Sequence, residues 1–235
     1  MNLNTELQQK IDTTQTLLFD IVNEYSPAAF ANSFGAEDMV LTDILCRHAP
    51  DIEIFTLDTG RLPAETYALM QETLQRYGRC IVPYFPEYQA IEHYMQEHGP
   101  NAFYDSVVLR KRCCYIRKVE PLKRALQGKK AWITGLRREQ APTRTDLTAK
   151  EWDEGNGLYK FNPLIDWTHQ DIWDYIRHFD VPYNALHDQH YPSIGCAPCT
   201  RAIAVGEDIR AGRWWWENPE NKECGLHVKK SAALV

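Results

Sequence analysis

The sequence predicts an α/β fold in which helices cover a mostly parallel sheet. Short apolar segments alternate along the chain with longer segments of helical periodicity, and no internal repeat interrupts them. Several apolar segments also end in polar turns that contain glycine. Because ligands of parallel sheets bind beyond the carboxyl ends of the strands, these turns are the first candidates for a functional site.

The N-terminal part shows the alternation clearly. Residues 4–25 carry apolar positions on one side of a helix, and residues 28–33 form a short apolar strand. A second helix is predicted over 37–48. The β-branched and aromatic segment 52–57 predicts a strand. The proline that opens residues 63–77 favours the first turn of a third helix.

The middle of the chain continues the pattern. Residues 79–83 are a further strand candidate, and residues 87–98 and 111–126 have helical periodicity. Residues 130–134 predict a strand that ends at a glycine. The polar stretch 140–157 contains proline, threonine and glycine, so we expect a mobile loop there.

The last regular elements are a strand over 158–164 and a helix over 168–179. Thr168 and Asp171 have the spacing of a capping box at the start of that helix. Beyond residue 181 we expect loops, short helices and a tail.

Composition limits the possible functions. A chain of 235 residues with 44% hydrophobic residues can bury a core without disulfides. The net charge of −6 argues against a nucleic-acid partner. No apolar run is long enough to cross a membrane, and residues 1–10 lack an apolar signal core. We therefore expect a cytoplasmic protein whose cysteines stay reduced.

The strand-end turns suggest a nucleotide site. Segments 33–38, 57–60 and 134–138 each follow a predicted strand and should meet at one edge of the sheet. A single such turn is more often plain structure. Glu37 and Asp38 would also repel a pyrophosphate, so the pattern favours a ligand held mainly by its adenosine.

Three arginines follow the strand at 130–134. Arg137, Arg138 and Arg144 could bind a phosphate or sulfate through bidentate hydrogen bonds. A solvated, charged loop is the alternative reading.

Four of the seven cysteines form two pairs, Cys113-Cys114 and Cys196-x-x-Cys199. Four thiolates can hold zinc or an iron–sulfur cluster, and adjacent cysteines fit the corners of a four-iron cluster better than one zinc ion. Unligated thiols remain a third reading. Cations near the first pair would favour an anionic cluster. They are Arg110, Lys111, Arg112, Arg117 and Lys118.

The remaining cysteines differ in their surroundings. Cys46 and Cys80 lie in apolar or strand-like segments, so we interpret both as buried packing residues. Cys224 lies in a polar tail whose nearby lysines and His227 would favour its nucleophilic thiolate. A bystander thiol is the alternative. The three tryptophans at 214–216 suggest a contact surface, because no periodicity would bury all three in one direction.

Together these segments resemble the sulfonucleotide reductases, and within them the branch of assimilatory adenylyl-sulfate reductases. The resemblance covers residues 26–235, and its most specific motifs are the tandem cysteine, the Cys-x-x-Cys pair and Glu223-Cys224-Gly225-Leu226-His227. It implies an adenine nucleotide alpha-hydrolase-like fold, related to the ATP pyrophosphatases, over residues 1–205. Residues 206–235 would then form a C-terminal catalytic tail.

The resemblance also implies a chemistry. A 4Fe-4S cluster would be bound by Cys113, Cys114, Cys196 and Cys199. Cys224 would attack the sulfur of adenosine 5′-phosphosulfate, giving an S-sulfocysteine and AMP, and thioredoxin or a glutaredoxin-like dithiol would release sulfite. Residues around the nucleotide would be Ser33, Phe34, Gly35, Leu57 and Gly135, with Lys118, Arg137, Arg138, Arg144, Arg210, Arg213 and His227 near its anionic groups.

Three alternatives stay open. A reductase for the 3′-phosphorylated nucleotide is the nearest, although that branch lacks the cluster cysteines. A tRNA-thiolation enzyme of the same fold should show a basic surface, which this chain lacks. A non-catalytic zinc-binding module is the third. The sequence leaves the oligomeric state open, including a homo-oligomer.

Overall fold

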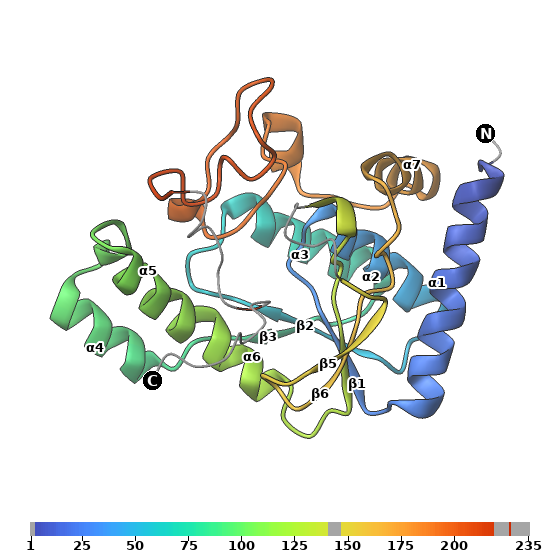
Figure 1. Cartoon of the computed structure of the whole chain (residues 1–235), viewed down its shortest axis with the longest axis horizontal. Helices are drawn as coiled ribbons and strands as arrows, with labels where there is room; N and C mark the ends of the chain where they lie inside the picture. Colours follow the sequence, from blue (N-terminus) through green and yellow to red (C-terminus); the bar gives the residue numbers. More distant parts are fainter. Residues whose placement is uncertain (1–2, 141–146, 219–225, 227–235) are drawn as a thin grey trace. The chain divides into compact units, whose positions relative to one another are not determined.

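The structure is a computed structural model, and it describes residues 3–140, 147–218 and 226. The chain divides into two compact units (Figure 1). The sheet unit comprises Met1–Thr56, Ala64–Val82 and Gly128–Ala185. The cysteine unit comprises Leu57–Pro63, Pro83–Gln127 and Leu186–Val235.

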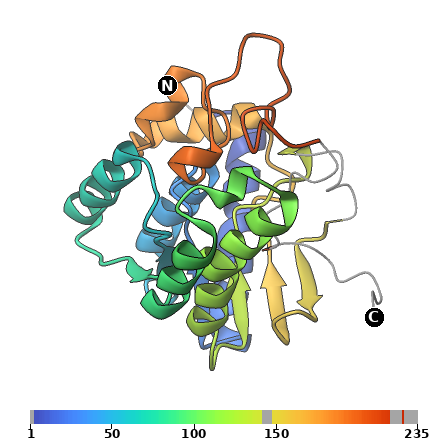
Figure 2. The ribbon, with the colours of Figure 1, turned by 90° about the vertical axis from the view of Figure 1, so that its left-hand side faces the viewer.

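A six-stranded sheet has the order β3-β2-β1-β4-β6-β5. Its strands are β1 (Ala28–Ala31), β2 (Glu53–Leu57), β3 (Val82–Tyr84), β4 (Ala131–Ile133), β5 (Lys150–Asp153) and β6 (Leu158–Phe161). β1 pairs in parallel with β2 and β4, and β4 pairs in parallel with β6. Only the β5–β6 pair, shown in yellow in Figure 2, is described as antiparallel. The predicted mostly parallel α/β class is confirmed.

The helices of the sheet unit begin and end close to their predicted positions. They are α1 (Thr5–Glu24), α2 (Ala36–His48), α3 (Ala64–Tyr77) and α7 (His169–Phe179). The Asn4 side chain caps α1 by accepting from the Glu6 amide at 3.1 Å. The capping box of Thr168 and Asp171 is present at α7. Among the described residues, none of the helices combines the length and apolar character needed to span a bilayer.

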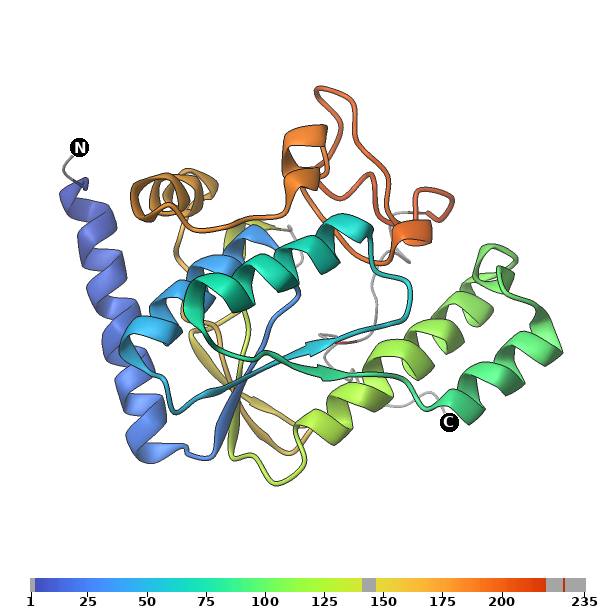
Figure 3. The same cartoon turned by 180° about the vertical axis from the view of Figure 1, so that it is seen from behind.

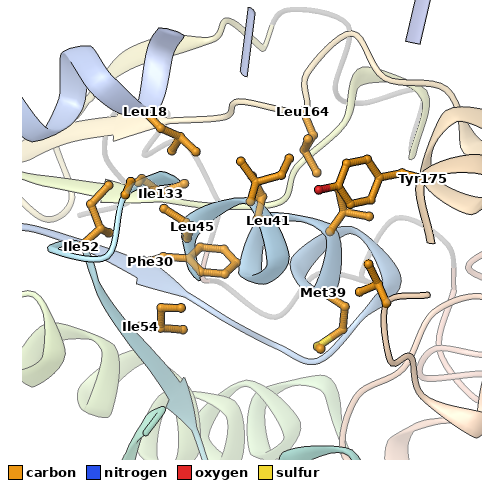
Figure 4. Packing of buried hydrophobic residues seen from close by; sticks show 14 of the residues in the cluster. Leu18, Phe30, Met39, Leu41, Leu45, Ile52, Ile54, Ile133, Leu164 and Tyr175 are labelled. Atoms are coloured by element: carbon orange, nitrogen blue, oxygen red, sulfur yellow. The ribbon is translucent and has the colours of Figure 1, made fainter. Parts of the chain in front are cut away.

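The core of the sheet unit lies between the sheet and its helices. The register places Phe30 opposite both Ile54 and Ile133, so these side chains share one face of the sheet. Figure 4 shows Leu18 of α1 and Leu41 and Leu45 of α2 gathered with Phe30 and Ile133. This packing fixes the start of α2 against the carboxyl ends of β1 and β4.

The cysteine unit is mainly helical. It contains α4 (Tyr88–His98), α5 (Val107–Cys114), a π-helix (Tyr115–Val119) and α6 (Glu120–Ala125). Figures 1 and 3 show α4 alongside α5, and the Tyr94 hydroxyl donates to the Leu109 carbonyl across that contact at 3.2 Å. The single helix expected over residues 111–126 is therefore three consecutive helical segments.

Two expectations were wrong. Residues 140–157 are not wholly loop, because β5 forms within them at the edge of the sheet. Its sequence, KEWD, is polar because an edge strand can expose one face to water. Cys80 is exposed, while Cys46 is partly buried against the core as expected.

Candidate functional site

The first candidate site is the turn between β1 and α2 in the sheet unit. Asn32 accepts a hydrogen bond from the Phe34 amide at 2.6 Å, and its own amide group donates to the Thr42 hydroxyl at 2.8 Å. Phe34 adopts a left-handed backbone with φ of 61°. Its side chain is buried in the core of the unit. The turn therefore presents backbone, rather than the Phe34 ring, toward the edge of the sheet.

Asp38, in the first turn of α2, closes this segment. Its Oδ2 atom accepts from the Ser33 amide at 2.7 Å and from the Ser33 hydroxyl at 2.6 Å. The Gly135 amide, at the end of β4, donates to the same carboxylate. Burial, with a further contribution from Glu37, raises the pKa of Asp38 to about 6. One carboxylate thus joins the ends of two adjacent parallel strands.

Glu37 has a different partner. Its Oε1 atom accepts from Arg137 Nε at 2.9 Å and from Nη2 at 2.8 Å, while Arg137 Nη1 lies 2.9 Å from Glu139 Oε2. Burial opposes the ionisation of Glu37, but Arg137 outweighs it and lowers the pKa of Glu37. Arg137 is therefore buried in a bridge between the turn after β1 and the turn after β4.

The structure brings together Ser33, Gly35, Gly135 and Arg137 of the predicted nucleotide residues. Arg138 lies nearer the surface, where it pairs with Asp166 and donates to the Leu147 carbonyl. Leu57 ends β2 and belongs to the cysteine unit. Arg144 lies outside the described residues.

The second candidate site lies wholly within the cysteine unit. Cys113 and Cys114 end α5, whose first turn is capped by the Ser106 hydroxyl accepting from the Leu109 amide at 3.1 Å. The chain then continues as the π-helix. A π-helical turn is wider than an α-helical turn and is frequent at functional sites. It changes the direction in which the residues after the cysteine pair project.

Cys196 and Cys199 flank a short 3₁₀-helix (Ala197–Cys199). The Thr200 hydroxyl donates to the Cys196 carbonyl at 3.0 Å and accepts from the Gly195 amide at 3.1 Å. The loop after β2 supports the same segment. Its Arg61 carbonyl accepts from the Ala197 amide at 2.8 Å, and Thr59 Oγ1 lies 3.3 Å from Cys196 Sγ.

All four paired cysteines line one cavity. The space between its walls measures about 320 Å³, open solvent included. The other lining residues are Arg61, Phe103, Arg110, Arg117, Lys118 and Pro198. Burial raises the pKa of the Cys113 thiol, and burial together with the neighbouring thiols raises that of Cys199 to about 12. Within the described part of the chain, no group of three or more His, Cys, Asp or Glu residues could hold one metal ion.

The cations around this cavity are held in place. Arg117 Nη1 donates to the Thr59 carbonyl at 2.5 Å. Arg110 forms a buried bidentate pair with Glu217 and also bonds the Cys114 side chain. Two guanidinium groups lie over the Trp214 ring, with Arg110 Cζ 4.9 Å and Arg213 Cζ 4.7 Å from its centroid.

The tryptophan segment packs on the cysteines rather than forming one exposed surface. Trp214 is buried with Cys199 and Phe103, and Trp216 is partly buried against the same cluster. Trp215 is 40% exposed. The Trp214 amide donates to the Cys199 carbonyl at 3.2 Å, and Thr200 and Arg213 form a β-bridge. Cys224 and His227 lie outside the described residues.

Sequence reasoning missed several residues that build these sites. Asn32 and Thr42 hold the first turn, and Thr59 and Arg61 support Cys196. Glu217 was missed as well. Its signal was an acidic residue directly after three tryptophans, which needs a cationic partner if it is buried. Arg210 and Arg213 lie in the cysteine unit, where Arg213 Nη1 donates to the Ile194 carbonyl at 3.2 Å.

A family model for the phosphoadenosine phosphosulfate reductase domain matches residues 27–202. A protein of Allochromatium vinosum named adenosine 5′-phosphosulfate reductase is 59% identical over 216 residues, which cover 92% of this chain and 84% of that protein. A protein of the same name from Burkholderia cepacia is 53% identical, covering 96% of this chain and 90% of that protein.

Solved structures show related folds. The phosphoadenylyl-sulfate reductase of Candida auris, crystallised with phosphate, has a TM-score of 0.70 at 27% identity, covering 86% of this chain and 99% of that one. The FMN adenylyltransferase of Candida glabrata has a TM-score of 0.60 at 18% identity, covering 99% and 81% of the two chains, which indicates a shared fold alone.

Proposed function

Because this chain belongs to the family of the phosphoadenosine phosphosulfate reductase domain, we propose that it reduces adenosine 5′-phosphosulfate to sulfite and AMP in sulfate assimilation. Relatives named for that substrate are 59% and 53% identical over most of the chain. Identity at this level over nearly the full length supports the same substrate and the same reaction class. The enzyme is accordingly an oxidoreductase.

The observation that carries the cofactor assignment is the meeting of Cys113, Cys114, Cys196 and Cys199 around one cavity. Two of these residues are more than 80 positions from the other two in the sequence. Thiolates are the preferred ligands of iron–sulfur clusters. Adjacent cysteines such as Cys113 and Cys114 fit the corners of a four-iron cluster better than they fit one zinc ion, which supports a polynuclear centre over zinc.

The surroundings of the cavity fit an anionic cluster. Arg61, Arg110, Arg117 and Lys118 line it, and positive charge stabilises such a centre. The buried N–H groups that have no acceptor among the described atoms include Arg117 Nε, Trp214 Nε1 and Trp216 Nε1. Trp214 and Trp216 pack against the cysteines, so sulfur in the cavity would be a nearby acceptor. When bound, a 4Fe-4S cluster would supply an anionic, redox-capable centre.

The chemical step is assigned to Cys224. Its thiolate would attack the sulfate sulfur, forming an S–S bond and breaking the S–O bond, so that AMP leaves with the bridging oxygen and its electron pair. A dithiol of the thioredoxin or glutaredoxin class would then attack Cys224 Sγ. Sulfite would leave with the electron pair of the broken S–S bond, and the dithiol would be oxidised to a disulfide.

Cations would stabilise the charge that develops on the bridging oxygen and the sulfonate. We assign this role to Lys118, which lines the cysteine cavity, with Arg144, Arg210, Arg213 and His227. Adenosine would lie against Ser33, Gly35 and Gly135, whose backbones the structure brings together, and against Phe34 and Leu57. In the same proposal, residues 206–235 act as a catalytic tail on residues 1–205, and the enzyme is cytoplasmic.

Steady-state assays with thioredoxin test the substrate. Sulfite release should show a much higher kcat/KM for adenosine 5′-phosphosulfate than for its 3′-phosphorylated form. Equal values, or a preference for the 3′-phosphorylated nucleotide, would assign the chain to the other branch. That branch is the alternative to consider, because the Candida auris relative is named for the 3′-phosphorylated substrate.

A further inference from the structure

Thr134 and Asn162 meet at the carboxyl ends of two neighbouring strands of the sheet unit. β4 pairs in parallel with β6, and the register of Ile133 with Phe161 brings the next residue of each strand side by side. The Thr134 hydroxyl donates to Asn162 Oδ1 at 2.6 Å, and both residues are buried. Because ligands of parallel sheets bind beyond this edge, the pair lies where the sheet can influence a bound ligand.

Asn162 joins the turn after β4 to the segment that leads into β5. Besides accepting from Thr134, its side chain donates through Nδ2 to the Thr148 carbonyl at 2.9 Å. Its backbone amide donates to the Ala149 carbonyl at 2.9 Å, and its carbonyl accepts from the Ile165 amide at 3.1 Å. The oxygen and the nitrogen of this buried side chain are therefore both hydrogen-bonded, which fixes its orientation.

Thr134 passes this restraint to the turn that contains Gly135. Its Oγ1 atom also accepts from the Leu136 amide at 3.4 Å, and its own amide donates to the Phe161 carbonyl at 3.0 Å. Gly135, between these contacts, donates its amide to the Asp38 carboxylate. A Cβ atom built at Gly135 would lie 2.2 Å from Asp38 Oδ1, so the backbone there is closely packed. One hydroxyl thus holds the residues on both sides of Gly135.

We propose that Asn162 is a positioning residue for nucleotide binding: through the Thr134 hydroxyl it holds the Gly135 backbone in the arrangement that meets the nucleotide. It acts without contacting the ligand, because its side-chain oxygen and nitrogen are both bonded to protein groups. The effect on the nucleotide rests on the proposed function, in which Gly135 lies against adenosine. The restraint of the turn rests on the hydrogen bonds alone.

Removal of the Thr134 hydroxyl tests the proposal. Thr134→Val keeps the shape of the side chain and loses both hydrogen bonds, whereas Thr134→Ser keeps the hydroxyl. Thr14→Val is the matched control, since the buried Thr14 hydroxyl also donates once, to the Pro163 carbonyl at 3.2 Å, and accepts once, from Trp167 Nε1 at 3.2 Å. The control therefore removes two hydrogen bonds between α1 and the segment after β6 and leaves the contacts around Gly135 intact.

Two measurements on the full-length protein separate the restraint from its effect on binding. Amide hydrogen exchange, followed by mass spectrometry on peptides that cover residues 131–140, reports the restraint without any ligand. Calorimetric titration with AMP reports the affinity. Thermal unfolding shows which variants are folded. If Thr134→Val does not fold, Asn162→Ser carries the test, because a serine side chain is too short to bridge Thr134 and Thr148.

Thr134→Val should exchange the amides of the turn about tenfold faster than wild type and bind AMP about tenfold more weakly, which is the factor expected for a lost buried hydrogen bond. Thr134→Ser should match wild type in both measurements. Thr14→Val should lose a similar amount of stability and still match wild type in exchange of the turn and in AMP affinity. A purely structural role would lower stability in both valine variants and leave AMP affinity unchanged in both.

Wild-type exchange or wild-type AMP affinity in the folded Thr134→Val protein would overturn the inference. Equal losses of affinity in Thr134→Val and Thr14→Val would overturn it as well. A wild-type protein that does not bind AMP would count against the proposed nucleotide site itself, and faster exchange in Thr134→Val would then still support the restraint of the turn.

Discussion

Arg110 and Glu217, 107 positions apart in the sequence, form a bidentate ion pair inside the cysteine unit. Arg110 Nε lies 2.9 Å from Glu217 Oε1, and Nη2 lies 2.6 Å from Oε2. Both side chains are buried. The pair ties the segment after the tryptophans to the helix that carries Cys113 and Cys114.

Breaking this pair should destabilise the fold strongly. Glu217→Ala leaves the Arg110 charge buried without its main counterion, which typically costs about 3–5 kcal/mol. Urea unfolding followed by tryptophan fluorescence measures the change. Glu207→Gln, which disturbs a partly exposed pair with Arg201, is the control and should cost about 1 kcal/mol or less. Equal effects of the two substitutions would show that the buried pair has no special role.

Asp38 should make stability fall as pH rises through weakly acidic values. Its pKa is about 6 in the folded protein, because burial disfavours the charged form, against an ordinary value of 3.8. Between about pH 4 and pH 6 the folded state holds this proton more tightly than the unfolded state, so ΔG of unfolding decreases as pH increases. The full difference corresponds to about 3 kcal/mol.

Urea unfolding of wild type and Asp38→Asn at a series of pH values isolates that contribution. Asp38→Asn has no carboxyl group at position 38, so the stability of the variant relative to wild type should rise from pH 4 to pH 6 and then level off. A stability difference that does not vary with pH would contradict the assigned pKa.

Local signals in the sequence predicted most of the fold. The capping box of Thr168 and Asp171 involves neighbours in the chain, so its pattern could be read directly. The edge strand β5 was missed because its polar residues carry no hydrophobic periodicity, and its pairing with β6 depends on the sheet. The π-helix after Cys114 was missed because its residues are ordinary helix formers, so no pattern separated it from an α-helix.

The candidate sites could be predicted only in part. Spacing indicated that Cys113-Cys114 and Cys196-x-x-Cys199 are two pairs that could share a metal site, and only the family resemblance implied that all four are ligands. The contacts that hold them, such as Thr59 with Cys196, join residues far apart in sequence and depend on the tertiary fold. The partners of Asp38 were likewise hidden, because Gly135 is distant in the chain.

Substitution of a cavity cysteine should abolish metal binding. Protein purified without oxygen should contain about four irons and four sulfides per chain, and Cys199→Ser should lose both because one thiolate corner is missing. Cys80→Ser, at an exposed site in the sheet unit, is the matched control and should keep both. Iron, zinc and acid-labile sulfide analyses measure the contents. Stoichiometric zinc without acid-labile sulfide would contradict the cluster assignment and indicate a zinc site instead.

The central claim, that Cys224 accepts the sulfonate of adenosine 5′-phosphosulfate, is tested most directly by weighing the intact protein after incubation with that nucleotide and no reductant. The account predicts a sulfonate adduct that peptide mapping places on Cys224 and that thioredoxin removes as sulfite. Cys224→Ser should form no adduct, keep its iron and lose turnover by several orders of magnitude, because a serine hydroxyl is a poor nucleophile toward sulfur. An adduct mapped to Cys46 or Cys80, or turnover in Cys224→Ser close to that of wild type, would contradict it.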